Sequence, residues 1–399
     1  DAQGNPTGVL VADPNPMILY RTIAKLPQLS PTDQANSARQ FYRELNRFGL
    51  TSAIDAGGGG HTFPVDYSGT RALAESGELP LRVSYYLFPQ KPGRELQDFR
   101  DWMSITVPGE NHHAGLAHGY ATRGGGEFLV WAAGDFENFM AEQPLQSEAM
   151  EPELKRVTME LVRNRWPFRI HATYDESVSR VLNVLEAVNR DIPFDGLRWA
   201  IDHAETISPA NIQRIKRLGG GVAVQSRMAF AGEYFKQRYG AEAAGSAPPL
   251  RDLLEAGVPL GAGSDATRVS NYNPWTALHW LVTGQSVGGE QLLNERHRLS
   301  RAEALRLYTV GAAWFSGEEN RKGRIAPGQY ADFALLSDDY FAVPEEGIRH
   351  IESVLTVLGG RVVYASGDYT QLAPPPGPVS PAWSPVARFG GHYSIPSTH

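Results

Sequence analysis

The chain contains no cysteine among its 399 residues, which excludes disulfide bonds, thiolate zinc sites and cysteine nucleophiles. No apolar run approaches the roughly 18 to 20 residues that cross a bilayer, and no signal peptide is visible, so we expect no membrane partner. A basic surface is also lacking. The net charge is −7 and no stretch gathers Lys and Arg, which argues against a nucleic-acid partner.

What the chain does contain is enough apolar sequence to bury a core. Hydrophobic residues make up 42% of the chain and charged residues 20%, a balance typical of globular proteins. We therefore expect a soluble protein, cytoplasmic or periplasmic, and a homodimer is compatible with the composition. The first residue is Asp1 rather than Met, so we expect that a segment upstream has been removed.

Short apolar runs alternate with amphipathic segments along most of the chain. Unalternating β-rich runs are typical of parallel strands buried on both faces, and helical spacing between them predicts crossover helices. We expect helices over residues 31–48, 151–165, 175–189 and 208–218. The strands are expected over residues 50–56, 81–88, 127–133, 168–173, 197–203, 221–226 and 259–265.

This alternation predicts an α/β fold of the (β/α)8, TIM-barrel type, with strands 2–8 present and strand 1 absent. Residues 1–315 are assigned to this barrel. Short strands and Gly turns assign residues 316–370 to the C-terminal part of a small β-sandwich, and residues 371–399 form a Pro-rich extended tail. We expect the missing N-terminal segment to complete the barrel.

Three predicted strands end in residues that bind metal ions. His171, His203 and Asp265 lie where the C-terminal ends of parallel strands meet, and imidazole and carboxylate ligands suit Zn, Fe or Mn. Taken alone, a strand histidine is more often a hydrogen-bonded core residue, and an aspartate after Gly-Ser is more often a turn residue. Their occurrence at the same level of the barrel is what predicts a metal site.

Longer segments around these residues resemble the amidohydrolase superfamily, and more narrowly its YtcJ-like branch, amidohydrolase family 3. The resemblance covers residues 4–368. It implies a metal-dependent hydrolase of C–N bonds in amides, formamides or cyclic amides, with a small-molecule substrate and a divalent metal, foremost Zn, with Fe, Mn or Co compatible. The segments that carry it include PFRIHATYDES, LRWAIDHAETISPANIQRIKRLGGGVAVQS, PLRDLLEAGVPLGAGSDATRVSNYNPWTALHWLVTG and RAEALRLYTVGAAWFSGEENRKGRIAPGQYADFALLSDD.

The same resemblance implies roles for individual residues. His171 and His203 correspond to metal ligands, and Asp265 to a ligand and general acid/base that moves a proton from a metal-activated water to the leaving nitrogen. We expect substrate contacts from Arg227, Asp55 and His61. A surface ion pair for Arg227, and turn-shaping roles for the other two, remain open alternatives.

The chain departs from the family at its first strand, which should end in a His-x-His pair. No such pair occurs in the sequence. His112 and His113 are adjacent and would point to opposite sides of a strand, and with His118 they fall in a Gly-rich loop expected over residues 111–126. We expect none of them to be a ligand.

A second departure concerns the fourth strand, where many relatives carry a lysine that can bridge two metals. The run at 127–133 offers Leu129 and Ala133 in place of the lysine and an acid, so we expect no bridged two-metal centre. Glu127 and Asp135 are conceivable substitutes, but each is more often a surface residue at a strand end.

Two other functions compete with the hydrolase. A catalytically degenerate barrel that serves as a binding or structural scaffold is motivated by the missing lysine. A glycoside hydrolase needs paired carboxylates, of which only Asp55 and Asp265 are well placed. Metal analysis of His171→Ala and His203→Ala variants tests the hydrolase, and a His-x-His pair upstream of Asp1 in the intact gene product would exclude the scaffold.

Overall fold

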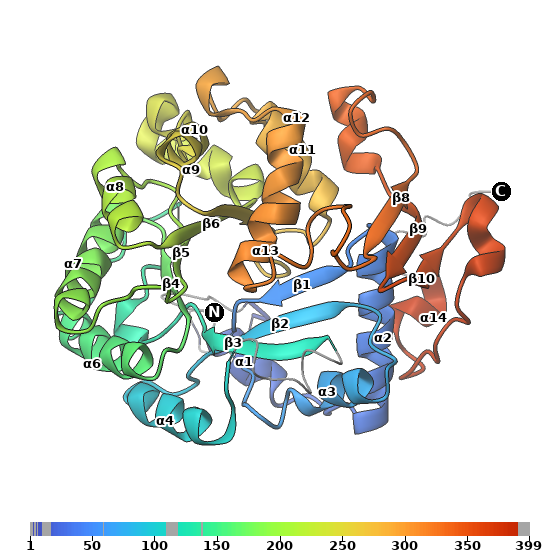
Figure 1. Ribbon diagram of the computed structural model, residues 1–399, viewed down its shortest axis with the longest axis horizontal. Coiled ribbons are helices and arrows are strands. Elements are labelled where there is room, and N and C mark those ends of the chain that lie inside the picture. The colour runs from blue at the N-terminus through green and yellow to red at the C-terminus, as the bar shows by residue number, and fades with distance from the viewer. Residues whose placement is uncertain are drawn as a thin grey trace.

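The computed structural model describes residues 3, 5, 7–9, 17–58, 60–108, 119–136 and 139–389. Within these ranges, parallel strands form one curled sheet in which each strand pairs with the next along the chain (Figure 1). The expected α/β fold with a parallel sheet is confirmed. The strands of this sheet are β1 Ser52–Asp55, β2 Arg82–Leu87, β3 Tyr120–Gly125, β4 Phe168–Ala172, β5 Trp199–His203, β6 Gly221–Gln225 and β7 Leu260–Gly263.

Helices cover the outer face of this sheet (Figure 1). Several begin as the sequence predicts: the side chain of Ser208 accepts a hydrogen bond from the Asn211 amide (3.3 Å), and Pro209 fills the first turn of its helix. None of the helices in the described ranges is long and apolar enough to cross a membrane. They are α1 Met17–Ile23, α2 Pro31–Arg47, α3 Ser68–Glu75, α4 Glu95–Ile105, α6 Met150–Arg163, α7 Asp175–Asp191, α8 Pro209–Arg217, α9 Met228–Ala244, α10 Leu250–Ala256, α11 Pro274–Thr283, α12 Arg301–Arg306, α13 Ala312–Phe315 and α14 Pro385–Phe389.

The strand expected over residues 127–133 is wrong. Those residues form a loop with a 3-10 turn at Trp131–Ala133, and the strand lies earlier, at β3. Its glycines allow neighbouring backbone to approach: a Cβ on Gly124 would lie 1.9 Å from the carbonyl oxygen of Pro167. This glycine-rich run resembles a loop in the sequence but forms a strand in the structure. Its residues are glycines because a larger side chain would clash with the neighbouring backbone.

The inner face of the sheet is packed with side chains. Arg169 on β4 donates to Asp202 on β5, with Nε 2.8 Å from Oδ2, and its guanidinium lies 5.4 Å from the ring centres of both Tyr86 and Phe315. Phe315 comes from α13, so this helix contributes to the interior. The sheet encloses a packed core rather than a pore.

The segment that leads into α13 lies against β7. It is a π-helical turn, Leu307–Gly311, within an otherwise α-helical stretch. A Cβ on Gly311 would lie 2.3 Å from the carbonyl oxygen of Leu260, so the two backbones are in direct contact. Glycine is required where backbones approach this closely.

A cluster of buried charges lies inside the sheet near the N-terminal ends of the strands. Glu318 accepts from Lys322 (2.7 Å) and pairs with Arg123 (3.1 Å), whose Nε donates to the hydroxyl of Ser84 (3.0 Å). Burial acts to raise the pKa of Glu318, but Lys322 and Arg123 outweigh it and hold that pKa below its usual value.

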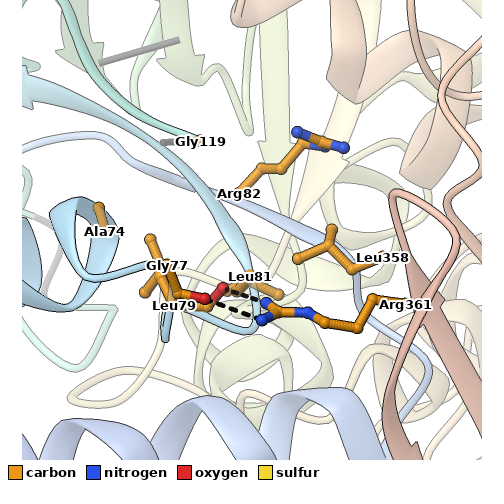
Figure 2. A pocket seen from close by; sticks show the side chains of 8 residues that line it. All are labelled: Ala74, Gly77, Leu79, Leu81, Arg82, Gly119, Leu358 and Arg361. Carbon is orange, nitrogen blue, oxygen red and sulfur yellow. Dashed lines mark hydrogen bonds between the residues drawn. The ribbon is translucent and has the colours of Figure 1, made fainter. Parts of the chain in front are cut away.

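A second sheet of three antiparallel strands adjoins the same end of the first, as the sequence predicts. It consists of β8 Phe333–Leu336, β9 Ser353–Leu358 and β10 Arg361–Ala365. Figure 2 shows a pocket between the two sheets, where Arg361 donates to the carbonyl oxygens of Gly77 (2.8 Å) and Leu79 (3.2 Å). Arg82 on β2 also donates to Asp332 (2.6 Å). This pocket lies at the N-terminal ends of the strands, and these hydrogen bonds connect the second sheet to the first.

Candidate metal centre

Two adjacent strands bring the predicted histidines together at the opposite end of the sheet. His171 is on β4 and His203 ends β5, beside it in the sheet (Figure 1). Their ring centres are 4.3 Å apart and both residues are buried. His203 and the following Ala204 have left-handed backbone, with φ of 82° and 54°, which residues other than glycine rarely adopt. Such backbone outliers are frequent at functional sites.

A carboxylate completes this pair. The Oε2 atom of Glu127 lies 3.0 Å from Nε2 of His203 and 3.4 Å from Nδ1 of His171. Backbone hydrogen bonds fix Glu127 on both sides, from its own amide to Ala56 and from the His171 amide to its carbonyl. Burial acts to raise the pKa of Glu127, but the two histidines outweigh it and hold the pKa well below its usual value.

Asp135 holds the far side of His171. It is fully buried, accepts hydrogen bonds from the amides of Thr173 (2.9 Å) and Tyr174 (3.1 Å), and lies 3.0 Å from Nε2 of His171. Burial acts to lower the pKa of His171, but Asp135 and Glu127 outweigh it and hold that pKa well above its usual value. The position therefore favours positive charge.

The donor atoms of Glu127, His171 and His203 all lie within 4.8 Å of one another, which fits a single metal ion. Two imidazoles and a carboxylate are a donor set that zinc, iron and manganese accept. Phe128 and Phe136 pack beside the imidazole of His171, with ring centres 4.8 and 6.1 Å from it. Aromatic rings on this side exclude water and strengthen the electrostatic interactions within the group.

Asp265 is outside that group of three but close to it. It follows β7, has left-handed backbone with φ of 56°, and its side chain is one-third exposed (33%). The buried guanidinium of Arg227 connects it to the group: Nη2 lies 3.4 Å from Oδ2 of Asp265 and also donates to Nδ1 of His203. Nε of Arg227 is 3.1 Å from the carboxylate of Glu205.

The two remaining predicted residues follow the first strand. Asp55 ends β1 and accepts a hydrogen bond from the amide of Gly57 (3.0 Å). Desolvation by the surrounding protein raises the pKa of Asp55 although the residue reaches solvent, while the bond from Gly57 and the charge of His61 act against the rise. His61 is exposed in the following loop. The roles assigned to Asp265, Arg227, Asp55 and His61 stay predictions.

The surface interpretation of Glu127 and Asp135 is wrong, because both contact His171 and Asp135 is fully buried. We excluded a bridged two-metal centre on the assumption that Leu129 and Ala133 lie in a strand. They do not, so this reason for the exclusion no longer holds. The run Gly124–Gly126 directly before Glu127 was a local sign of close backbone approach, although it does not by itself predict a strand. His112, His113 and His118 lie outside the described residues.

Comparison with known proteins identifies the family. Residues 1–364 match the profile described as "Amidohydrolase family". The chain belongs to the amidohydrolase family. Its resemblance to YtcJ is confirmed: it is 29% identical to the putative amidohydrolase YtcJ of Bacillus subtilis over 200 residues, 49% of this chain and 37% of that protein.

Two further comparisons extend this picture of an amidohydrolase. The chain is 27% identical to the N-substituted formamide deformylase of Arthrobacter pascens over 197 residues, 49% of this chain and 36% of that protein. It shares its fold with the crystal structure of an uncharacterized metal-dependent hydrolase from Pyrococcus horikoshii, with a TM-score of 0.62 at 19% identity, covering 82% and 64% of the two chains. The matches span little more than a third of each curated relative.

Proposed function

We propose that this amidohydrolase is a metal-dependent hydrolase of C–N bonds in amides, formamides or cyclic amides. The observation that carries the proposal is the convergence of donor atoms from Glu127, His171 and His203 within 4.8 Å at the C-terminal end of the parallel strands. Membership of the amidohydrolase family supports the reaction class, and the name of the Arthrobacter relative supports formamides as one substrate type.

Each residue of the group has a separate role in binding a cation. His171 and His203 supply nitrogen donors, Glu127 supplies negative charge, and Asp135 orients His171 from behind. A divalent metal, foremost Zn, with Fe, Mn or Co as alternatives, supplies a Lewis acid and lowers the pKa of water when bound. The buried position of both imidazoles keeps these donors in place before any ligand arrives.

Asp265 is the proposed general acid/base. Its carboxylate lies at the same rim as the histidines, connected through Arg227, and its side chain is open enough to reach a substrate. It accepts a proton from the attacking water and returns it to the nitrogen, which would otherwise leave as a poor anionic group. Asp55 and His61, at the end of β1, are proposed substrate contacts.

We also propose that the sheet belongs to an eight-stranded barrel. Among the described residues β1 and β7 each pair with only one neighbouring strand, and an eighth strand between them would close the sheet. The expected division into a barrel, a part-sandwich and a tail stays a prediction. The scaffold alternative is motivated by the missing lysine, and the carboxylate of Glu127 beside His171 and His203 favours the hydrolase over it.

Metal analysis of purified protein tests the function. The protein is expressed with Zn²⁺ or Co²⁺, and bound metal is measured for the unmodified chain, for His171→Ala and for His203→Ala. Both variants should lose the ion, while His279→Ala, a buried histidine beside Glu346 on a different element, serves as the matched control and should retain it. Unchanged metal content in the first two variants would overturn the proposal.

A further inference from the structure

Arg227 is an unusual neighbour for a metal ligand. It immediately precedes α9 and is 1% exposed, so its guanidinium is enclosed by protein. Nη2 donates to Nδ1 of His203 and lies 3.4 Å from Asp265, and Nε is 3.1 Å from Glu205. The imidazole of a metal-binding histidine ordinarily donates its second N–H to an acceptor such as a carboxylate or carbonyl. Here a cationic donor stands in that place.

This contact fixes the tautomer of His203. A guanidinium has only N–H donors, no acceptor, and keeps its charge in proteins, so Nδ1 must be the accepting nitrogen. A neutral imidazole has one accepting nitrogen, and the hydrogen therefore sits on Nε2. That hydrogen points at Oε2 of Glu127, 3.0 Å away.

We propose that Arg227 competes with the metal for the single lone pair of His203. A metal that bound Nδ1 would displace the guanidinium directly. A metal that bound Nε2 would shift the ring hydrogen to Nδ1, where it would face another donor. Whichever nitrogen binds, the contact between Arg227 and His203 has to break. The inference rests on the proposed metal site at Glu127, His171 and His203.

The structure also supplies the second position for Arg227. Glu205 is buried and anchors Nε, while the half-open carboxylate of Asp265 is already within 3.4 Å of Nη2. When the metal binds, the guanidinium turns from His203 to Asp265. Arg227 is thus a positioning residue with two settings, and occupancy of the metal site determines how closely its guanidinium pairs with the proposed acid/base.

Nuclear magnetic resonance of the imidazole nitrogens reads the tautomer without any substitution in the site. In metal-free protein labelled with 15N-histidine and 15N-arginine, His203, assigned with His203→Gln, should carry its hydrogen on Nε2. Addition of Zn²⁺ should either move the ring hydrogen to Nδ1 or place the metal on Nδ1 instead of Arg227. The broadened side-chain resonances of Arg227 should then sharpen at new chemical shifts. A hydrogen on Nδ1 in the metal-free protein, or identical Arg227 resonances in both states, would overturn the inference.

Metal affinity supplies a second, independent measurement. A hydrogen bond from a charged group contributes more to stability than a bond between neutral groups. Removing the bond from Arg227 to His203 should therefore tighten Zn²⁺ binding by about ten- to hundredfold. The variant is Glu205→Gln with Arg227→Met, which avoids leaving Glu205 buried without a partner. Arg123→Met removes another buried arginine at the other end of the sheet and should bind Zn²⁺ as the unmodified protein does.

The two proposals fail in different ways. If the unmodified protein binds no Zn²⁺, or binds it equally well after His171→Ala, the metal function is wrong. If it binds Zn²⁺ through His171 and His203 but the double variant binds no more tightly, the function stands and the competition is wrong.

Discussion

The two ends of the curled sheet both bury charged side chains, but the charges are balanced differently. At the N-terminal end, the carboxylate of Glu318 has Lys322 and Arg123 within 3.1 Å. This cluster contains more positive than negative groups. Every contact in it joins a donor to an acceptor, and nothing more is needed to satisfy it.

At the C-terminal end, within the part of the chain that the structure describes, the carboxylates outnumber the fixed cations. Glu127, Asp135, Glu205 and Asp265 surround two imidazoles, and Arg227 is the guanidinium among them. Carboxylates are expensive to bury together unless a cation joins them. The comparison indicates that one end of the sheet is built for stability and the other for a positively charged ligand. The experiments below separate these two roles.

Glu318→Gln should have the largest effect, on stability alone. Removal of the carboxylate leaves Arg123 and Lys322 buried beside each other, and breaking a buried ion pair in this way costs about 3 to 5 kcal/mol. Chemical denaturation measures the loss, and Zn²⁺ affinity should not change. A loss below about 1 kcal/mol would mean that the cluster does not hold the N-terminal end together.

Glu127→Gln should differ from Glu318→Gln by weakening metal binding. Metal affinity should fall by about a hundredfold or more, since the charged donor is lost and even partners behind a ligand contribute ten- to hundredfold. The free energy of unfolding of the metal-free protein should also fall, because His171 and His203 hold the pKa of Glu127 well below its usual value and the ionised carboxylate therefore stabilises the fold. Isothermal titration calorimetry with Zn²⁺ measures the metal affinity, and chemical denaturation of the same sample measures the free energy of unfolding. Weakened folding with intact metal affinity would reverse the comparison.

Asp135→Asn should weaken metal binding by about tenfold. The amide oxygen can still accept from the backbone of Thr173 or Tyr174, but the negative charge behind His171 is gone. Titration with Co²⁺, followed by its visible absorption, measures the shift. Affinity equal to that of the unmodified protein would show that Asp135 only supports the loop.

Glu303→Gln should have the smallest effect and a distinct dependence on pH. Hydrogen bonds from Arg251 and Ser300 at the start of α12 lower the pKa of Glu303 to about 2. Because its unfolded value is about 4.3, the carboxylate stabilises the fold fully above that pH and loses this contribution as pH falls toward 2. We expect a loss of about 1 kcal/mol at pH 7 that shrinks by pH 3. Equal losses at both values would exclude the ionised form as the cause.

The sequence predicts most of the fold because most strands are locally consistent. β4, β5 and β6 are short, apolar and buried on both faces, and amphipathic helices follow β4 and β5. β3 is the exception. Its glycines are set by the approach of the Pro167 carbonyl, a tertiary contact that no local pattern contains. The apolar run after it, including Phe128, is buried in a loop and resembles a strand for that reason.

The candidate site was predictable only where the strands were. His171 and His203 sit at the ends of correctly placed strands, so the barrel rule finds them. Glu127 and Asp135 were misplaced by the same error that misplaced β3, since residues assigned to a strand cannot also occupy the loop beyond it. The Arg227 contacts depend on how α9 begins against β5 and β7, which only the folded chain reveals.

The direct backbone contact between Gly311 and β7 has a mechanical consequence. The strand that leads to Asp265 is in contact with the backbone of the π-helical turn at Gly311 and with the side chain of Phe315. A methyl group added at residue 311 would clash with the carbonyl oxygen of Leu260 and push β7 away. This would displace the proposed acid/base, Asp265, although residue 311 does not contact it. The position of Asp265 can therefore be altered from residue 311 while the rim itself keeps every residue.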